Sequence, residues 1–222
     1  MAFLSIDTFA GRLRRLRLYL GEVWRYYSHP VFRTADVNLI YSYLMHNPYT
    51  VAKEFALQKG DTSIYTYGET PLVTMDQIAT CADIGETDVV YELGAGRGRT
   101  CFWLRCFKKC RVVGIEHNPE FIRRAQAVAD KWQLGSEIQF LCEDFLETDL
   151  SPATVIYLDG TCLEPSDIHR LSERILTLKP GTRVVTVSYP LEGLILNETR
   201  TLAFSWADAE VYFQHVPLSI SI

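Results

Sequence analysis

The sequence Val-Val-Tyr-Glu-Leu-Gly-Ala-Gly-Arg-Gly-Arg-Thr, residues 89–100, decides the fold expected for this chain of 222 residues. Two β-branched residues and a tyrosine indicate a strand, three glycines at alternate positions indicate a tight turn, and residues 101–107 continue as a helix. Glycine is needed where the chain takes a positive φ or where a ligand contacts the backbone, and a helix start presents unpaired N–H groups. This strand, turn and helix junction therefore predicts a ligand-binding site.

The spacing of the glycines separates two classes of nucleotide-binding protein. A dinucleotide-binding turn needs its third glycine at position 99, where this chain has Arg99, and the glycine falls at Gly98. The pattern Glu92-x-Gly94-x-Gly96-x-Gly98 instead resembles the first motif of class I S-adenosylmethionine-dependent methyltransferases. A glycine-rich turn in another kind of α/β protein is the alternative that this motif alone leaves open.

The composition is that of an ordinary globular protein, with 48% hydrophobic residues. No run approaches the roughly 18 apolar residues of a membrane span, and Arg12 interrupts the apolar N-terminal residues, so we expect a cytoplasmic protein. The cysteines are expected to be reduced thiols. Cys101, Cys106 and Cys110 lie close together but lack the Cys-x-x-Cys spacing of a zinc site, and no metal is predicted.

The basic charge of the chain is concentrated near its N-terminus. Residues 1–60 carry a net charge of +4 and residues 61–222 carry −9. The acidic main part argues against direct binding of nucleic acid, although the basic part could steer toward an acidic partner.

Residues 1–62 are predicted to form a helical segment in front of a main domain of residues 63–222. Residues 7–28 have the pattern of an amphipathic helix, with leucines at helical spacing and arginines between them. We expect its apolar stripe to pack on the rest of the chain, while contact with a membrane or nucleic acid is the alternative. Pro30 is expected to end this helix, and further helices are expected over residues 34–45 and 48–57.

From residue 89 onward, strands and helices alternate. This rhythm predicts an α/β fold with a doubly wound, Rossmann-like sheet of seven strands, mainly parallel and closed by an antiparallel C-terminal hairpin. The predicted later strands cover residues 111–116, 138–142, 154–159 and 182–188, the helices residues 119–132 and 165–178, and the hairpin residues 201–206 and 210–216.

Acidic residues stand where the predicted strands end, and ligands of open α/β sheets bind at that edge. Glu92 ends the first strand, and Glu116 ends the second, where a carboxylate can accept both hydroxyls of a ribose. Nicotinamide enzymes also place an acid there. Asp144 can accept a hydrogen bond from an adenine amine, and Phe145 can stack on its ring or pack in the core. Asp159 ends the fourth strand at the same crevice.

A narrower resemblance covers residues 65–216. The loop Tyr67-Gly68-Glu69-Thr70, the glycine turn, the later strand ends and the pair Ser205-Trp206 resemble successive motifs of the non-SET histone-lysine methyltransferases of the disruptor-of-telomeric-silencing family. The resemblance implies S-adenosyl-L-methionine as the cofactor. It further implies that the cofactor is contacted at its methionine end by Tyr67, Glu69 and Thr70, at the turn by Gly94 and Gly96, at its ribose by Glu116, and at its adenine by Asp144 and Phe145.

The substrate end departs from that family. Asp159, Gly160 and Thr161 stand where the family has two asparagines before a phenylalanine, and Phe213 stands at the position of a tyrosine in its lysine channel. We expect Asp159 to orient the acceptor nitrogen or take its proton, and Tyr67 and Phe213 to form channel walls. A related family of lysine methyltransferases acts on other proteins, so the target need not be a histone.

The sequence therefore predicts a methyltransferase that acts on a lysine amine of a protein. A sulfonium methyl group is already activated, so the protein must mainly align a deprotonated amine and exclude water. An apolar channel favours the neutral lysine. A small-molecule methyltransferase and a non-enzymatic binding module that retains the fold are the alternatives, while Arg99 disfavours a nicotinamide oxidoreductase.

Overall fold

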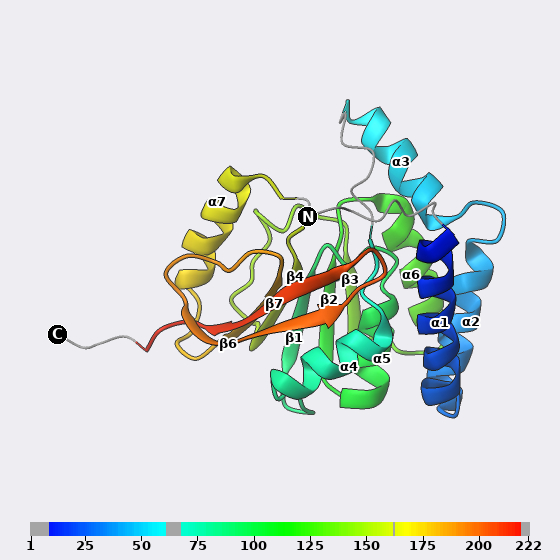
Figure 1. Ribbon diagram of the computed structural model, residues 1–222, viewed down its shortest axis with the longest axis horizontal. Helices are drawn as coiled ribbons and strands as arrows, with labels where there is room; N and C mark the ends of the chain where they lie inside the picture. The colour runs from blue at the N-terminus through cyan, green and yellow to red at the C-terminus, as the bar shows by residue number, and fades with distance from the viewer. Residues whose placement is uncertain (1–8, 61–67, 162, 219–222) are drawn as a thin grey trace.

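A single seven-stranded sheet forms the centre of the molecule (Figure 1). The computed structural model describes residues 9–60, 68–161 and 163–218. The strand order is β3-β2-β1-β4-β5-β7-β6; the first five strands are parallel, and β7 runs antiparallel to both β5 and β6. The predicted doubly wound sheet is confirmed. The strands are β1 (Val89–Leu93), β2 (Arg111–Ile115), β3 (Ile138–Leu141), β4 (Val155–Asp159), β5 (Arg183–Val187), β6 (Ile195–Ala203) and β7 (Asp208–His215).

Helices cover both faces of the sheet and divide the core into two clusters. One cluster lies under α4 (Leu72–Cys81), α5 (Arg99–Lys108) and α6 (Pro119–Lys131), and its largest fully buried side chain is Trp103. The other lies under α7 (Pro165–Leu176). Because β1, β2, β4 and β5 are buried almost throughout, their continuous apolar runs fit a parallel sheet that is covered on both sides.

Three N-terminal helices form an additional layer, namely α1 (Phe9–Tyr26), α2 (Pro30–Ser42) and α3 (Pro48–Gln58). Figure 1 shows α1 and α2 side by side beyond α5 and α6, and α2 contacts both of the latter helices. Helix α2 begins earlier than predicted, with Pro30 in its first turn. Proline is tolerated there because the N–H that it lacks would have no partner within the helix, and His29 caps the helix. The predicted boundary at residues 62–63 falls outside the described residues.

The apolar row of α1 faces solvent, so the prediction that it packs on the rest of the chain is wrong. Leu13, Leu16, Leu20 and Trp24 are all exposed, whereas Glu22 on the opposite side is buried. A buried ion pair between Glu22 and Arg99 holds the polar side of the helix inward.

The terminal hairpin lies earlier in the chain than predicted. Its first strand, β6, ends at Ala203, and the N–H of Phe204 donates to the carbonyl of Ala207 in the connecting turn. Trp206 therefore belongs to this turn, where its large ring packs against the loop before α4. In the described part of the chain, no helix combines the length and apolar character needed to cross a bilayer.

Candidate functional site

The glycine turn connects the end of β1 to the start of α5. Gly94, Gly96 and Gly98 all have positive φ values, of 77°, 53° and 77°. The N–H of Gly98 donates to the carbonyl of Ala95 at 2.8 Å, which tightens the turn. A Cβ atom at Gly98 would lie 2.5 Å from the ring of Phe140, so only glycine fits there.

The backbone beside Gly94 is accessible to a ligand. A Cβ atom built at Gly94 would meet no atom within 4 Å, so the space next to this peptide is open. The two glycines therefore serve different purposes. Gly98 allows close packing at the start of the helix, and Gly94 leaves the backbone open at the end of the strand. The open backbone is suited to close approach by a bound molecule.

Glu116, which follows β2, lies directly beside the glycine turn. Its carboxylate accepts hydrogen bonds from the N–H groups of Gly96 and Asn118, each at 2.9 Å. Burial raises the pKa of Glu116, while these backbone hydrogen bonds oppose the rise. A half-buried carboxylate held by two backbone donors is fixed in place and retains lone pairs for further hydroxyl donors.

Glu92, at the other side of the turn, is engaged with α5. The hydroxyl of Thr100 donates to its carboxylate at 2.5 Å and the thiol of Cys101 at 3.1 Å. Burial raises the pKa of Glu92 to about 7, although both hydrogen bonds lower it. The charges of Asp159 and Glu116 add to the rise, so two of the other predicted strand-end acids lie within electrostatic reach of Glu92.

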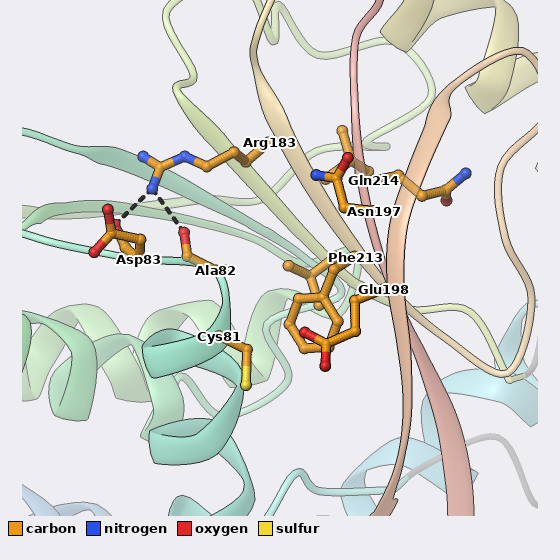
Figure 2. A pocket seen from close by; sticks show the side chains of 10 residues that line it. Cys81, Ala82, Asp83, Arg183, Asn197, Glu198, Phe213 and Gln214 are labelled. Atoms are coloured by element: carbon orange, nitrogen blue, oxygen red, sulfur yellow. Dashed lines mark hydrogen bonds between the residues drawn. The ribbon is translucent and has the colours of Figure 1, made fainter.

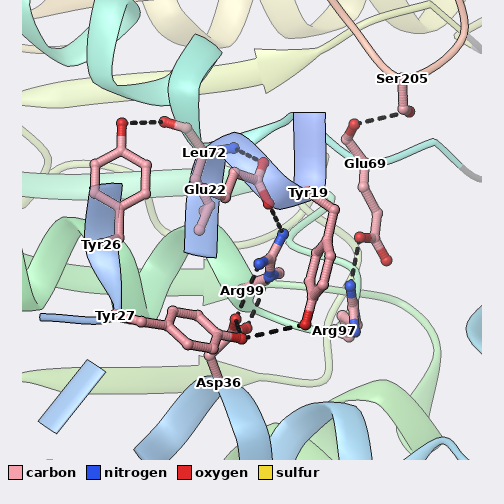
Figure 3. Close-up of polar contacts among 10 residues, drawn as sticks. All are labelled: Tyr19, Glu22, Tyr26, Tyr27, Asp36, Glu69, Leu72, Arg97, Arg99 and Ser205. Atoms are coloured by element: carbon pink, nitrogen blue, oxygen red, sulfur yellow. Dashed lines mark hydrogen bonds and ion pairs between the residues drawn. The ribbon is translucent and has the colours of Figure 1, made fainter. Parts of the chain in front are cut away.

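The loop before α4 is joined to the turn and to the hairpin (Figure 3). Glu69 forms an ion pair of 2.6 Å with Arg97, and its carbonyl accepts a hydrogen bond of 3.0 Å from the hydroxyl of Ser205. Gly68 packs against Trp206, so closely that a Cβ atom there would lie 2.7 Å from the indole ring.

Thr70, which follows Glu69 in the same loop, is joined to the centre of the sheet. Its hydroxyl lies 2.6 Å from that of Tyr157 on β4. Tyr67 lies outside the described residues.

Asp159 ends β4 in a short chain of hydroxyl groups. Its carboxylate accepts a hydrogen bond of 2.7 Å from the hydroxyl of Thr161, which lies 2.8 Å from that of Ser188, after β5. Burial raises the pKa of Asp159, and the hydrogen bonds from Thr161 oppose the rise. Ser188 has a φ of 73°, which is strained for a residue with a side chain, and such strain is concentrated at functional sites.

The remaining predicted site residues are more dispersed. Asp144 is exposed after β3 and accepts a hydrogen bond of 2.8 Å from the N–H of Leu146, while Phe145 packs partly into the core under α7. Phe213 is buried in the middle of β7 opposite Val185, beside a small hollow at the amino-terminal end of β5 (Figure 2). The structure therefore does not bring Phe213 to the strand ends where the acids gather.

Sequence reasoning missed the roles of Arg97, Tyr157 and Ser188. Arg97 ties the glycine turn to Glu69, and Tyr157 ties β4 to the loop before α4. A tyrosine inside an otherwise aliphatic strand is a usable signal, because a buried hydroxyl needs a partner. The positive φ of Ser188 has no signature in the sequence, since serine rarely adopts it.

Comparison with known proteins shows that the chain is similar to methyltransferases. The family profile of the ANTKMT methyltransferase domain matches residues 92–198. A protein-lysine N-methyltransferase of Saccharolobus islandicus is 32% identical over 130 residues, which are 57% of this chain and 78% of that protein. A sterol 24-C-methyltransferase of Eremothecium gossypii is 32% identical over 107 residues, or 47% of this chain but only 29% of that protein.

Solved structures extend the similarity to the fold. The crystal structure of an RNA methyltransferase from Salinibacter ruber in complex with S-adenosyl-L-homocysteine is 32% identical, with a TM-score of 0.59, and the match covers 68% of this chain and 95% of that chain. The names of these relatives give different methyl acceptors but the same reaction, methyl transfer. The chain belongs to the class I S-adenosylmethionine-dependent methyltransferases.

Proposed function

We propose that this enzyme transfers a methyl group to the side-chain amine of a lysine in a protein. The observation that carries the proposal is Asp159, a half-buried carboxylate at the strand-end edge whose pKa is raised by burial. Such a group can accept a hydrogen bond from a lysine ammonium and take its proton. The similarity to the Saccharolobus islandicus protein-lysine N-methyltransferase supports the same acceptor.

The residues at the glycine turn fit S-adenosylmethionine, which supplies a methyl group on a positively charged sulfur. The open backbone at Gly94 and the unpaired N–H groups of the start of α5 suit a close-lying cofactor. We assign Gly94 and Gly96 to its cradle and Glu116 to its ribose. Glu116 suits this role because its carboxylate is already oriented by two backbone donors.

The other assignments at the cofactor end follow the sequence. Asp144, which is exposed, would hydrogen-bond the adenine amine, and the partly buried ring of Phe145 would stack on the base. Glu69 and Thr70 would border the methionine end, and both are held by partners, Arg97 in the glycine turn and Tyr157 on β4. Glu92 would stabilise the turn from behind, because its carboxylate bonds to α5.

At the acceptor end, Asp159 is the residue assigned to the chemistry. Thr161 fixes one of its oxygens, so the other can face an incoming amine. The raised pKa makes its carboxylate a stronger base, which favours removal of the proton from a lysine. Tyr67 stays a predicted channel residue. For Phe213, burial in the middle of β7 supports a packing role more than a catalytic one.

Labelled-methyl transfer tests the proposal. The full chain and labelled S-adenosylmethionine are incubated separately with histones, with a mixture of other basic proteins, with total RNA and with a metabolite extract. We expect label in protein only, and N-methyl-lysine after acid hydrolysis. Label in RNA alone, or in metabolites alone, would contradict the proposal, as would methylation of a residue other than lysine.

Variants connect the activity to the site. Gly96→Arg would fill the turn, so we expect loss of both S-adenosylhomocysteine binding and methyl transfer. Asp159→Asn removes the base, and we expect the turnover number to fall about 100-fold or more. The surface variant Asp130→Asn serves as the control, because its carboxylate bonds only to the neighbouring Gln126 in the described contacts. Equal activity of Asp159→Asn and Asp130→Asn would show that Asp159 is not the base.

A further inference from the structure

Helix α1 presents a continuous apolar row to solvent. Leu13, Leu16, Leu20 and Trp24 follow one another at intervals of three or four residues, so they lie on one face of the helix. Their exposed fractions are 37%, 52%, 57% and 87%. The row extends about 16 Å along the helix at 1.5 Å per residue. Contiguous apolar surfaces of this kind often mark sites that bind another protein, a ligand or a membrane.

The orientation of α1 is fixed by polar contacts on its opposite side (Figure 3). Glu22 is buried; its carboxylate accepts a hydrogen bond of 2.6 Å from Arg99 and one of 2.7 Å from the N–H of Leu72. Nearby, the hydroxyl of Tyr26 donates to Asp76 at 3.0 Å. Turning the apolar row toward the protein would break these contacts and expose a buried ion pair. The outward direction of the row is therefore built into the fold.

The charge that α1 presents to solvent is positive. Glu22 is the only acidic residue among the eighteen residues of the helix, and it is 2% exposed. Arg17, at the edge of the apolar face, and Arg25, on the flank of the helix, are exposed. Arg14 on the flank is half-buried and reaches Asp208 of β7, which anchors the helix at its other end.

We propose that α1 lies flat on the surface of a membrane that contains anionic phospholipids. Leucines and an exposed tryptophan with flanking arginines are the composition that binds in the plane of the interface, with the apolar side chains at the boundary of the acyl chains. Arginines add attraction to anionic headgroups. In an isolated peptide, the polar side of such a helix would be hydrated, whereas here its side chains form hydrogen bonds and ion pairs with the rest of the protein. The enzyme would be held peripherally through this one helix, with the sheet standing off the membrane.

Vesicle co-sedimentation of the full chain tests this surface. Vesicles of phosphatidylcholine alone are compared with vesicles of phosphatidylcholine and phosphatidylglycerol. We expect binding to the mixed vesicles, weakened by added salt because the arginine contribution is screened. Leu20→Ser is expected to lower the partition coefficient about tenfold, since an exposed leucine that enters the interface loses its apolar contact. Arg17→Glu is expected to weaken binding to the mixed vesicles specifically.

The chain offers a matched control for the leucine. Leu57 in α3 is also 57% exposed, and Leu57→Ser is expected to bind vesicles as the unmodified chain does. Thermal unfolding of both variants establishes that they are folded. The proposal is overturned if the chain does not bind the mixed vesicles, or if Leu20→Ser and Leu57→Ser bind equally well. It is also overturned if sedimentation velocity shows a dimer that only Leu20→Ser dissociates, because a second copy would then cover the row.

Discussion

The carboxylate of Glu116 accepts a hydrogen bond of 2.9 Å from the backbone N–H of Gly96. Twenty residues separate the two in sequence, and the parallel pairing of β1 with β2 brings them together, since Leu93 pairs with Ile115. The backbone of the turn thus orients the carboxylate. A preorganised carboxylate of this kind avoids the cost of ordering on binding.

Replacement of Glu116 is expected to weaken cofactor binding without unfolding the protein. A hydrogen bond to a charged group contributes about 1.5 to 3 kcal/mol, so Glu116→Ala should lower the affinity for S-adenosylhomocysteine roughly 10- to 100-fold. Isothermal titration calorimetry measures this directly. Glu137→Ala, at an acid just before β3, is the control and should leave the affinity unchanged. An unchanged affinity in Glu116→Ala would remove Glu116 from the ribose site.

The glycines of the turn are expected to differ in their tolerance of a methyl group. Gly98→Ala combines a positive φ with a Cβ atom 2.5 Å from Phe140, so a loss of about 2 to 4 kcal/mol in the free energy of unfolding is expected. Gly94→Ala meets open space and should lose only about 1 kcal/mol, from its φ of 77°. Chemical denaturation compares the two. Equal losses would show that close packing at Gly98 does not matter.

The sheet and the strand-end acids were predictable because their signals are local. Alternating strands and helices, the spacing of Gly94 to Gly98 and an acid one strand later each depend on a few neighbouring residues. Parallel pairing then fixes their common edge. Local signals could not place Phe213, because the resemblance of its position to that of a channel residue does not fix where it lies along an antiparallel strand. The structure buries Phe213 opposite Val185, in the middle of β7.

The orientation of α1 was not predictable for a different reason. Helical periodicity identifies an apolar side and a polar side, and burial of the apolar side is the usual outcome. In this chain, the polar side is inward because Arg99 needs acidic partners. A cation at the first position of a helix is disfavoured by the helix dipole, and Glu22 and Asp36 provide the compensation.

That buried network is expected to be the strongest single polar contribution to the attachment of α1 and α2. Arg99 donates to both carboxylate oxygens of Asp36, at 2.7 and 2.9 Å, and Tyr27 donates to the same carboxylate at 2.8 Å. Removing one partner from a buried ion pair costs about 3 to 5 kcal/mol, because the other charge stays buried. Asp36→Ala should therefore lower the free energy of unfolding by about that amount.

Chemical denaturation of Asp36→Ala measures this loss, and a surface ion pair provides the comparison. Asp208, the partner of Arg14, is largely exposed, so Asp208→Ala should cost less than about 1 kcal/mol. If both variants lose the same free energy of unfolding, the network of Arg99 is not a special attachment point.

Glu92 gives the fold a dependence on pH that a glutamine would remove. Burial raises its pKa from 4.5 to about 7, so the folded state prefers the neutral acid. Below pH 4.5, the shifted pKa stabilises the folded state in full, by about 3 kcal/mol. This contribution falls as the pH rises, because Glu92 ionises at a lower pH in the unfolded chain than in the folded one, and it is lost above about pH 7. Glu92→Gln cannot ionise, yet its amide oxygen can still accept from Thr100. We expect the variant to gain stability relative to the unmodified chain as pH rises between these two values, measured by urea denaturation. Parallel stability curves would instead mean that Glu92 is already ionised in the folded protein near pH 4.5, with Thr100 and Cys101 compensating fully for its burial.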